Sequence, residues 1–186
     1  LTMLGASTIA TLTIGDVTAS SVFSDGGFQV TSTGTLNLTS GNFKLGSAAA
    51  ATTFPAFATR NINAGTTLEY ASGIAQTVSA TPIYQHLTLS GAGNKTAAAG
   101  LTVNGNFTIA AGTFTAGTFT HSVGGDWSNS GTFTANTSTV TMNGAGAQTL
   151  GGTVTTIFNH LTLSGAGNKT AAIDLTVNGD FTIAAG

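Results

Sequence analysis

Six acidic residues are the first candidates for chemistry in this chain, and they are spread along its length. They are Asp16, Asp25, Glu69, Asp126, Asp174 and Asp180. Enzymes that cleave polysaccharides need clustered carboxylates for acid and base catalysis or for Ca²⁺ binding. Asp174 and Asp180 are the pair that could do such work, but an earlier repeat has Gly100 and Asn106 at the equivalent positions. We therefore interpret the acids as solvated turn residues and predict no catalytic residue.

The three histidines lack the spacing of a metal site. His86 and His160 each precede a Leu-Thr-Leu triplet, one long repeat apart, which is too far for them to share an ion. His121 has Asp126 as its nearest acid in the sequence, and this is not a ligand spacing. The chain has no cysteine, which excludes thiolate ligands and disulfides. We predict packing or surface roles for the histidines, and neither a metal nor another cofactor.

Binding surfaces are the remaining candidates. Trp127, Tyr70 and Tyr84 are the aromatic residues that could contact a sugar, because all other aromatic residues are Phe, which has no polar group. Thr-x-Thr triplets could present a flat array of hydroxyl groups to ice or to sugars. Three such triplets begin at positions 113, 118 and 132, so their spacing along the chain is irregular. An ice-binding face needs a regular array, so this spacing argues against one.

The composition narrows the range of partners. Charged residues make up 5% of the chain, against roughly 25% in ordinary soluble domains. The net charge of −2 and the four basic residues exclude a nucleic-acid partner, which needs many cations to neutralise phosphates. The hydrophobic fraction of 41% argues against disorder, and it occurs in short triplets, so we predict no membrane span. The basic residues are Lys44, Arg60, Lys95 and Lys169.

A long internal repeat is the strongest feature of the sequence. Residues 86–112 and 160–186 differ at three of 27 aligned positions, at an offset of 74. Residues 67–78 align more weakly with 139–150, at an offset of 72. We divide the chain into one continuous segment, 1–186, whose copies cover approximately 12–86, 87–160 and, in part, 161–186, with 1–11 ending a preceding copy.

Short strands recur inside each unit. Triplets such as Leu101-Thr102-Val103 and Phe107-Thr108-Ile109 alternate apolar residues with Thr, the period of a strand that has one buried face. Turn signals such as Asn104-Gly105 follow at close intervals. Strands this short suit a coil that turns every few residues and stacks on the next coil. We predict an all-β fold, a parallel β-solenoid (β-helix) of 72–74 residue units that each hold several coils; tandem β-sandwich repeats are the alternative.

The alternation also predicts which side chains point inward. The predicted structural core is Leu87, Leu89, Leu101, Val103, Phe107, Ile109, Phe114, Phe119, Phe133, Val140, Leu161, Leu163, Leu175, Val177, Phe181 and Ile183.

Three runs of sequence suggest a family. The runs at 125–135 (GDWSNSGTFTA), 138–144 (STVTMNG) and 158–163 (FNHLTL) resemble repeats of large bacterial cell-surface and secreted proteins. Members of that group resemble right-handed parallel β-helices. The resemblance covers the second and third copies well and positions 1–60 loosely. It implies display outside the cell, as an adhesin stalk, a surface layer or an appendage, and it implies no particular ligand.

These observations together predict a structural protein and not an enzyme. We expect part of an extracellular filament, or of a cell-surface fibre or adhesin stalk, assembled by axial stacking of coils. The expected partners are other copies of the chain, in head-to-tail or lateral contacts, and surface glycans. Because the chain enters and leaves its unit in mid-repeat, we expect further coils to follow it. A polysaccharide-binding or polysaccharide-cleaving β-helix is the alternative, followed by an ice-binding protein.

Overall fold

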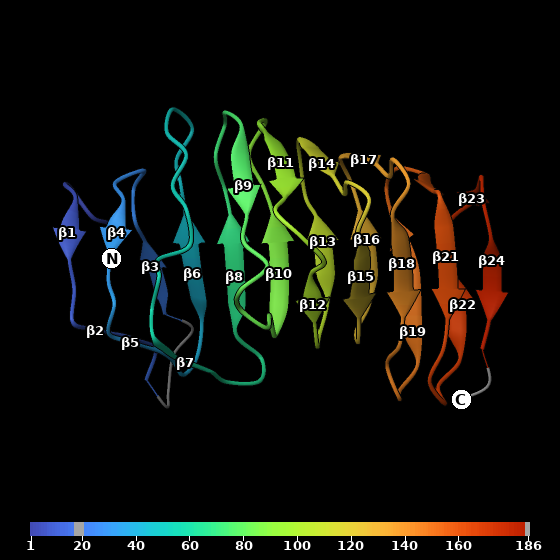
Figure 1. Cartoon of the computed structure of the whole chain (residues 1–186), viewed down its shortest axis with the longest axis horizontal. Coiled ribbons are helices and arrows are strands. Elements are labelled where there is room, and N and C mark those ends of the chain that lie inside the picture. The colour runs from blue at the N-terminus through green and yellow to red at the C-terminus, as the bar shows by residue number, and fades with distance from the viewer. Residues whose placement is uncertain (17–20, 185–186) are drawn as a thin grey trace.

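The regular structure of the protein consists of short parallel strands. The computed structural model describes residues 1–16 and 21–184, which contain 24 strands and no helix. The strands form a β-solenoid of about nine turns, and Figure 1 shows them side by side along the long axis, from β1 (Ser7–Thr8) to β24 (Phe181–Ile183). The predicted all-β parallel solenoid is confirmed, and the described residues do not form tandem sandwiches.

Most turns contribute one strand to each of three faces, always in the same order; residues 46–58 contribute no strand to the second face. Face A is one eight-stranded sheet, made of β3 (Val22–Ser24), β6 (Asn42–Leu45), β8 (Thr67–Tyr70), β10 (His86–Leu89), β13 (Phe107–Ile109), β16 (Trp127–Asn129), β19 (Gln148–Gly152) and β22 (Lys169–Ala171). This sheet continues without a break from the first turns to the last.

The other two faces are divided into shorter sheets. Face B, the second strand of a turn, comprises β1 with β4 (Val30–Thr31), then β9 (Gln76–Val78), β11 (Asn94–Ala97), β14 (Thr113–Thr115) and β17 (Thr132–Thr134), then β20 (Thr156–Phe158) with β23 (Leu175–Val177). Face C, the third strand, comprises β2 (Thr11–Ile14), β5 (Thr35–Leu38) and β7 (Thr59–Ile62), then β12 (Thr102–Val103), β15 (Thr120–Val123), β18 (Thr139–Met142), β21 (His160–Leu163) and β24. Residues 79–85 contribute no strand to face C between β7 and β12.

Glycine allows successive coils to approach closely at a corner after face A. Gly91 and Gly112 both have a positive φ, of 73° and 71°. A Cβ atom on Gly112 would lie 2.5 Å from the carbonyl oxygen of Gly91, well inside van der Waals contact. A larger residue would therefore strain both the backbone conformation and the stacking.

The core is a set of side-chain columns that run along the solenoid axis. On face A, Leu87 is in register with Phe107, and Phe107 is in register with Trp127. The rings of Phe107 and Trp127 are stacked, with centroids 4.7 Å apart and planes 8° from parallel. Such contacts repeat from coil to coil and replace the single compact core of a globular domain.

The predicted core residues fall into three groups. Nine are buried, namely Leu87, Leu89, Leu101, Val103, Phe107, Ile109, Phe114, Val140 and Leu161. Five are partly buried and pack against them, namely Phe119, Phe133, Leu163, Leu175 and Val177. Phe181 and Ile183 are 55% and 74% exposed. Both are in register with inward residues of β21, but no described coil lies beyond β24 to cover them.

The long sequence repeat does not coincide with a whole number of turns. The sequence His-Leu-Thr-Leu forms β10 on face A and, one repeat later, β21 on face C. These strands are eleven strands apart, which is three and two-thirds turns. The same sequence therefore folds alike on two different faces. The same offset carries Leu-Thr-Val from face C (β12) to face B (β23), so all three faces must be nearly equivalent in backbone geometry.

Phe107 and Phe181 provide a test of the columns, because they are equivalent in the repeat but differ in burial. Replacing Phe107 with Ala should lower the free energy of unfolding by about 3–5 kcal/mol, because it removes a ring from a packed column. Phe181→Ala should cost much less, since that ring is largely exposed. Urea unfolding of the 186-residue chain measures both values, and equal losses would contradict the inward assignment of Phe107.

Candidate functional site

The side chains of Asp25, Glu69 and Asp126 accept hydrogen bonds from nearby backbone or side-chain groups. Asp25 is fully buried, and its Oδ1 accepts hydrogen bonds from the N–H groups of Gly27 and Gly46, both at 2.8 Å. Its Oδ2 accepts a hydrogen bond from the hydroxyl of Thr52. Asp16 contributes its backbone carbonyl to the hydroxyl of Ser40, at 2.9 Å. Asp25 therefore orders two turns of neighbouring coils and is not free to react.

Glu69 lies on the outer side of face A within a small polar cluster. It forms an ion pair with Lys44 at 3.0 Å and accepts hydrogen bonds from Asn42 and Ser90, both at 2.6 Å. Burial alone would raise the pKa of Glu69, but the hydrogen bonds from Ser90 and Asn42 and the contact with Lys44 lower it below its usual value. The carboxylate stays ionised, which suits an ion pair rather than a general acid.

The structure does not bring Asp174 and Asp180 together. Asp174 is exposed just before β23, and Asp180 is exposed just before β24, which belongs to a different sheet. Asp180 lies instead beside His160, with its Oδ2 3.3 Å from Nδ1. In the described part of the chain no three His, Asp or Glu side chains gather in a way that could hold a metal ion.

A series of side chains joins successive coils at the entrance to face A. Nδ1 of His86 accepts a hydrogen bond from the N–H of Asn106 at 2.9 Å. Oδ1 of Asn106 accepts one from the N–H of Asp126 at 2.9 Å, and Oδ1 of Asp126 accepts one from the N–H of Thr149 at 2.7 Å. Each side chain thus satisfies a backbone donor of the following coil, and this explains His86 and Asp126 without any reactive role.

The other two histidines make the same kind of contact. Nδ1 of His160 accepts a hydrogen bond from the N–H of Asp180 at 2.9 Å, as the repeat predicts from His86. His121 is buried, with Nδ1 accepting a bond from the N–H of Leu101 at 3.2 Å and Nε2 lying 2.9 Å from the carbonyl oxygen of Ala116. Since Nδ1 is an acceptor, Nε2 carries the proton and donates it. Burial lowers the pKa of His121, so the ring is neutral.

Buried Lys and Gln side chains were not recognised in the sequence as core residues. Lys95 is fully buried, and its Nζ donates to the carbonyl oxygens of Ser72 and Gly93 at 2.7 and 3.0 Å. Burial lowers the pKa of Lys95. Lys169, its equivalent in the repeat, makes the same pair of contacts. The sequence signal that relates these two buried lysines is the repeat, because a buried lysine in one copy implies a buried lysine at the equivalent position of the next copy.

A glutamine precedes each of these lysines in the same column. Gln76 is in register with Lys95, and Gln148 with Lys169. Each Gln accepts from one backbone N–H group and donates to carbonyl oxygens of earlier turns. The corners of the solenoid therefore contain buried polar groups that are hydrogen-bonded, as such groups must be to be tolerated.

The aromatic residues that could have contacted a sugar are inside the solenoid. Trp127, Tyr70 and Tyr84 are all buried. The two tyrosine hydroxyls lie 3.0 Å apart, and Tyr84 also donates to the carbonyl oxygen of Ser79. Burial raises the pKa of Tyr70 to about 12 and that of Tyr84 well above its ordinary value. These residues stabilise the core and cannot form a platform for a sugar ring.

Hydroxyl-bearing side chains form regular rows on the outer sides of faces B and C. Their spacing follows sheet register and not distance in the sequence, so the sequence argument from irregular gaps is wrong about the array. One row on face B contains Thr77, Thr96, Thr115 and Thr134, and the row beside it contains Asn94, Thr113 and Thr132. A row on face C contains Thr102, Ser122, Thr141, Thr162 and Thr182.

Comparisons with known proteins give no family for this chain. No protein-family model, curated protein or solved structure matches it. Within the described ranges, no helix is long and apolar enough to cross a bilayer.

His121 makes the stability of the fold dependent on pH. Because burial lowers its pKa in the folded state, the unfolded chain binds a proton at higher pH than the folded chain does. The free energy of unfolding should therefore fall as the pH drops below about 6.5, the ordinary histidine value. Urea unfolding of wild type and His121→Gln between about pH 8 and pH 5 measures this. Wild type should lose more stability than the variant, and parallel curves would contradict the assignment.

Proposed function

We propose that this chain is a structural segment of an extracellular filament, or of a cell-surface fibre or adhesin stalk. The observation that carries the proposal is face A, one parallel sheet that runs in register from β3 to β22 along the long axis (Figure 1). A continuous ladder of backbone hydrogen bonds resists bending between coils. Such a stack provides length and stiffness, which are the properties a stalk requires.

The surface and the acidic residues are consistent with this role. The outer sides of faces B and C present rows of Thr, Ser and Asn rather than charges, which suits neutral polar contacts between neighbouring rods. The carboxylates of Asp25 and Glu69 are already paired with backbone or side-chain groups. The extracellular location is part of the proposal and rests on the resemblance to bacterial surface repeats.

Axial growth is the assembly mode we propose. Every coil presents the same kind of backbone edge to the next coil, and the sheet of face A keeps one register from β3 to β22. A coil of a second copy would pair with such an edge in the same register. Lateral contacts would use the hydroxyl rows.

Chains that carry extra repeat units test the rod geometry. Each added copy of the segment 87–160 supplies one repeat, which is three and two-thirds turns. At about 4.8 Å per coil, the rod should lengthen by about 18 Å for each unit. Small-angle X-ray scattering on a series of such chains measures the length. Growth with the square root of the number of units, as in flexibly linked domains, would contradict a stalk.

Ice binding is a second candidate, favoured by the two rows on face B. Neighbouring coils place their hydroxyl groups about 4.8 Å apart, and alternate residues of one strand lie about 6.6 Å apart. The hydroxyl of Thr115 also donates to Oδ1 of Asn94 at 2.9 Å, which holds the two rows in a fixed relation. A rigid two-dimensional lattice of hydroxyl groups can match an ordered water layer.

Thermal hysteresis of the 186-residue chain tests this second candidate. The wild type should depress the freezing point below the melting point, and Thr132→Lys should abolish the effect by placing a long charged side chain on face B. Thr141→Lys, on face C, is the matched control and should keep the activity. Absence of hysteresis in the wild type would exclude ice binding and leave the stalk proposal unaffected.

A further inference from the structure

Face C is interrupted at one place, between β7 and β12. β7 is the last strand of its three-stranded sheet, and β12 is the first strand of the five-stranded sheet that follows. Residues 79–85 cross the gap but form only one isolated bridge, from Tyr84 to Val103. The outer edge of β7 is therefore not covered by a strand of the next turn.

Arg60 lies at this interruption, in a position where the preceding turns have leucine. The register of face C places Leu12, Leu36 and Arg60 in one inward column. Leu12 and Leu36 are buried, whereas Arg60 is half-buried, and its Nε atom is buried without a hydrogen-bond partner. None of the described acidic residues forms an ion pair with it. The buried Nε–H group therefore lacks a partner, at a cost to stability that an acceptor atom of a ligand would remove.

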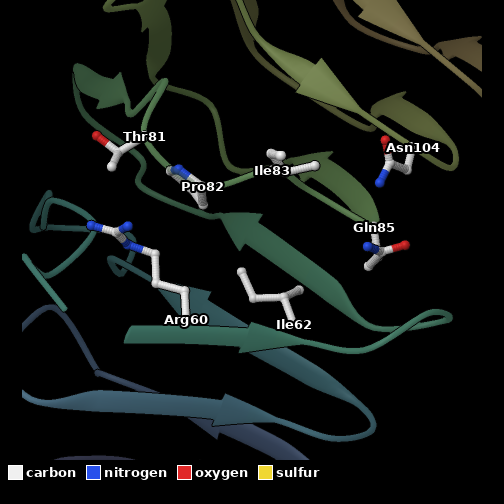
Figure 2. A pocket seen from close by; sticks show the side chains of 7 residues that line it. All are labelled: Arg60, Ile62, Thr81, Pro82, Ile83, Gln85 and Asn104. Atoms are coloured by element: carbon white, nitrogen blue, oxygen red, sulfur yellow. The ribbon is translucent and has the colours of Figure 1, made fainter. Parts of the chain in front are cut away.

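A groove of about 330 Å³ opens beside Arg60. Figure 2 shows Arg60 and Ile62 of β7 on one side, with Thr81, Pro82 and Ile83 on the other. Gln85 and Asn104 line one end, where Figure 2 shows their amide groups. The side chains of these two residues make no hydrogen bond within the described residues, so their donors and acceptors are available.

We propose that this groove binds a carboxylated sugar, a uronic acid unit of an acidic polysaccharide. The planar guanidinium group pairs with a carboxylate through two parallel hydrogen bonds, a geometry that lysine cannot provide. Gln85, Asn104 and Thr81 offer amide and hydroxyl groups for sugar hydroxyls, while Ile83 and Pro82 offer an apolar surface for the C–H side of the ring. The volume lies in the range of small-ligand pockets.

The composition of the groove argues against other anions. An amino acid or peptide carboxylate brings an ammonium group nearby, and no acidic residue lines the groove to pair with it. A phosphate dianion would be matched by one cation only. A single carboxylate surrounded by hydroxyl groups fits the one guanidinium and the uncharged polar groups best.

The register supplies a variant that separates binding from stability. Arg60→Leu restores the residue type of the column formed by Leu12 and Leu36. If Arg60 serves a ligand, this variant should keep or raise the melting temperature of the wild type and lose sugar binding. If Arg60 serves the fold, the same variant should lower the melting temperature.

Calorimetric and NMR titration of the 186-residue chain with digalacturonate tests the proposal. The wild type should bind digalacturonate, with neutral digalactose and inorganic phosphate binding at least about tenfold more weakly. Arg60→Leu should weaken digalacturonate binding about tenfold or more, and Asn104→Ala should weaken it less. Asn178→Ala is the matched control, because Asn178 is the repeat equivalent of Asn104 and lies outside the groove.

Four results would overturn the proposal. They are no binding of digalacturonate by the wild type, equal binding of digalactose, equal binding of phosphate, and unchanged binding by Arg60→Leu. A folded Arg60→Leu chain is shown by an unchanged circular dichroism spectrum, and if that variant fails to fold, Arg60→Lys serves in its place, with the same expected loss. The stalk proposal is tested separately by rod length and does not depend on this outcome.

Discussion

In-register stacking of one coil on the next is the constraint on which the structure depends. The backbone of each coil finds its partners in the coils on either side, as when the N–H of Phe107 donates to the carbonyl oxygen of Asp126, so no coil is satisfied alone. The same stacking places each inward side chain directly over another. The side chains of a column must therefore fit one another along its whole length, because a poor fit in one coil disturbs both of its neighbours. One such column contains Leu68, Leu87, Phe107 and Trp127.

Most polar residues in these columns are paired with backbone groups, although the Nδ2 atom of the buried Asn129 has no hydrogen-bond partner. The ammonium group of Lys95 lies against two carbonyl oxygens, and Gln76 and His121 each satisfy both backbone donors and acceptors. The carbonyl oxygens can accept two bonds, as that of Leu45 does from the N–H of Ala71 and from the side chain of Gln76. Arg60 differs from Lys95, Gln76 and His121, because its Nε atom has no partner and it lies in a column of leucines where the wall of the solenoid is open. This contrast is the reason for assigning it to a ligand and the others to the fold.

The outer surface follows from the same stacking. Alternation sends every second residue of a strand outward, and register then gathers those residues into rows, whether or not the rows have a function. The near-equivalence of the three faces shows how permissive this arrangement is, because the segment that begins at His86 occupies face A and its copy at His160 occupies face C. A further repeat can therefore be added without matching a whole number of turns. Growth of such a chain by duplication is limited by the fit of successive coils and not by the phase of the repeat.

The sequence by itself determined the fold class and most of the inward residues. Alternation of Thr with apolar residues defines which side of a strand is buried, and this local property placed Leu87, Phe107 and Val140 correctly. It also showed that His86 and His160 are equivalent. The local pattern does not show which strands are neighbours, because the coils of the solenoid differ in length. The coil from Thr67 to its register partner His86 is shorter than the coil from Asn42 to Thr67. Only the tertiary structure could therefore align the Thr rows, bury Trp127 and the two tyrosines, and place Arg60 in a column with two leucines at the edge of a groove.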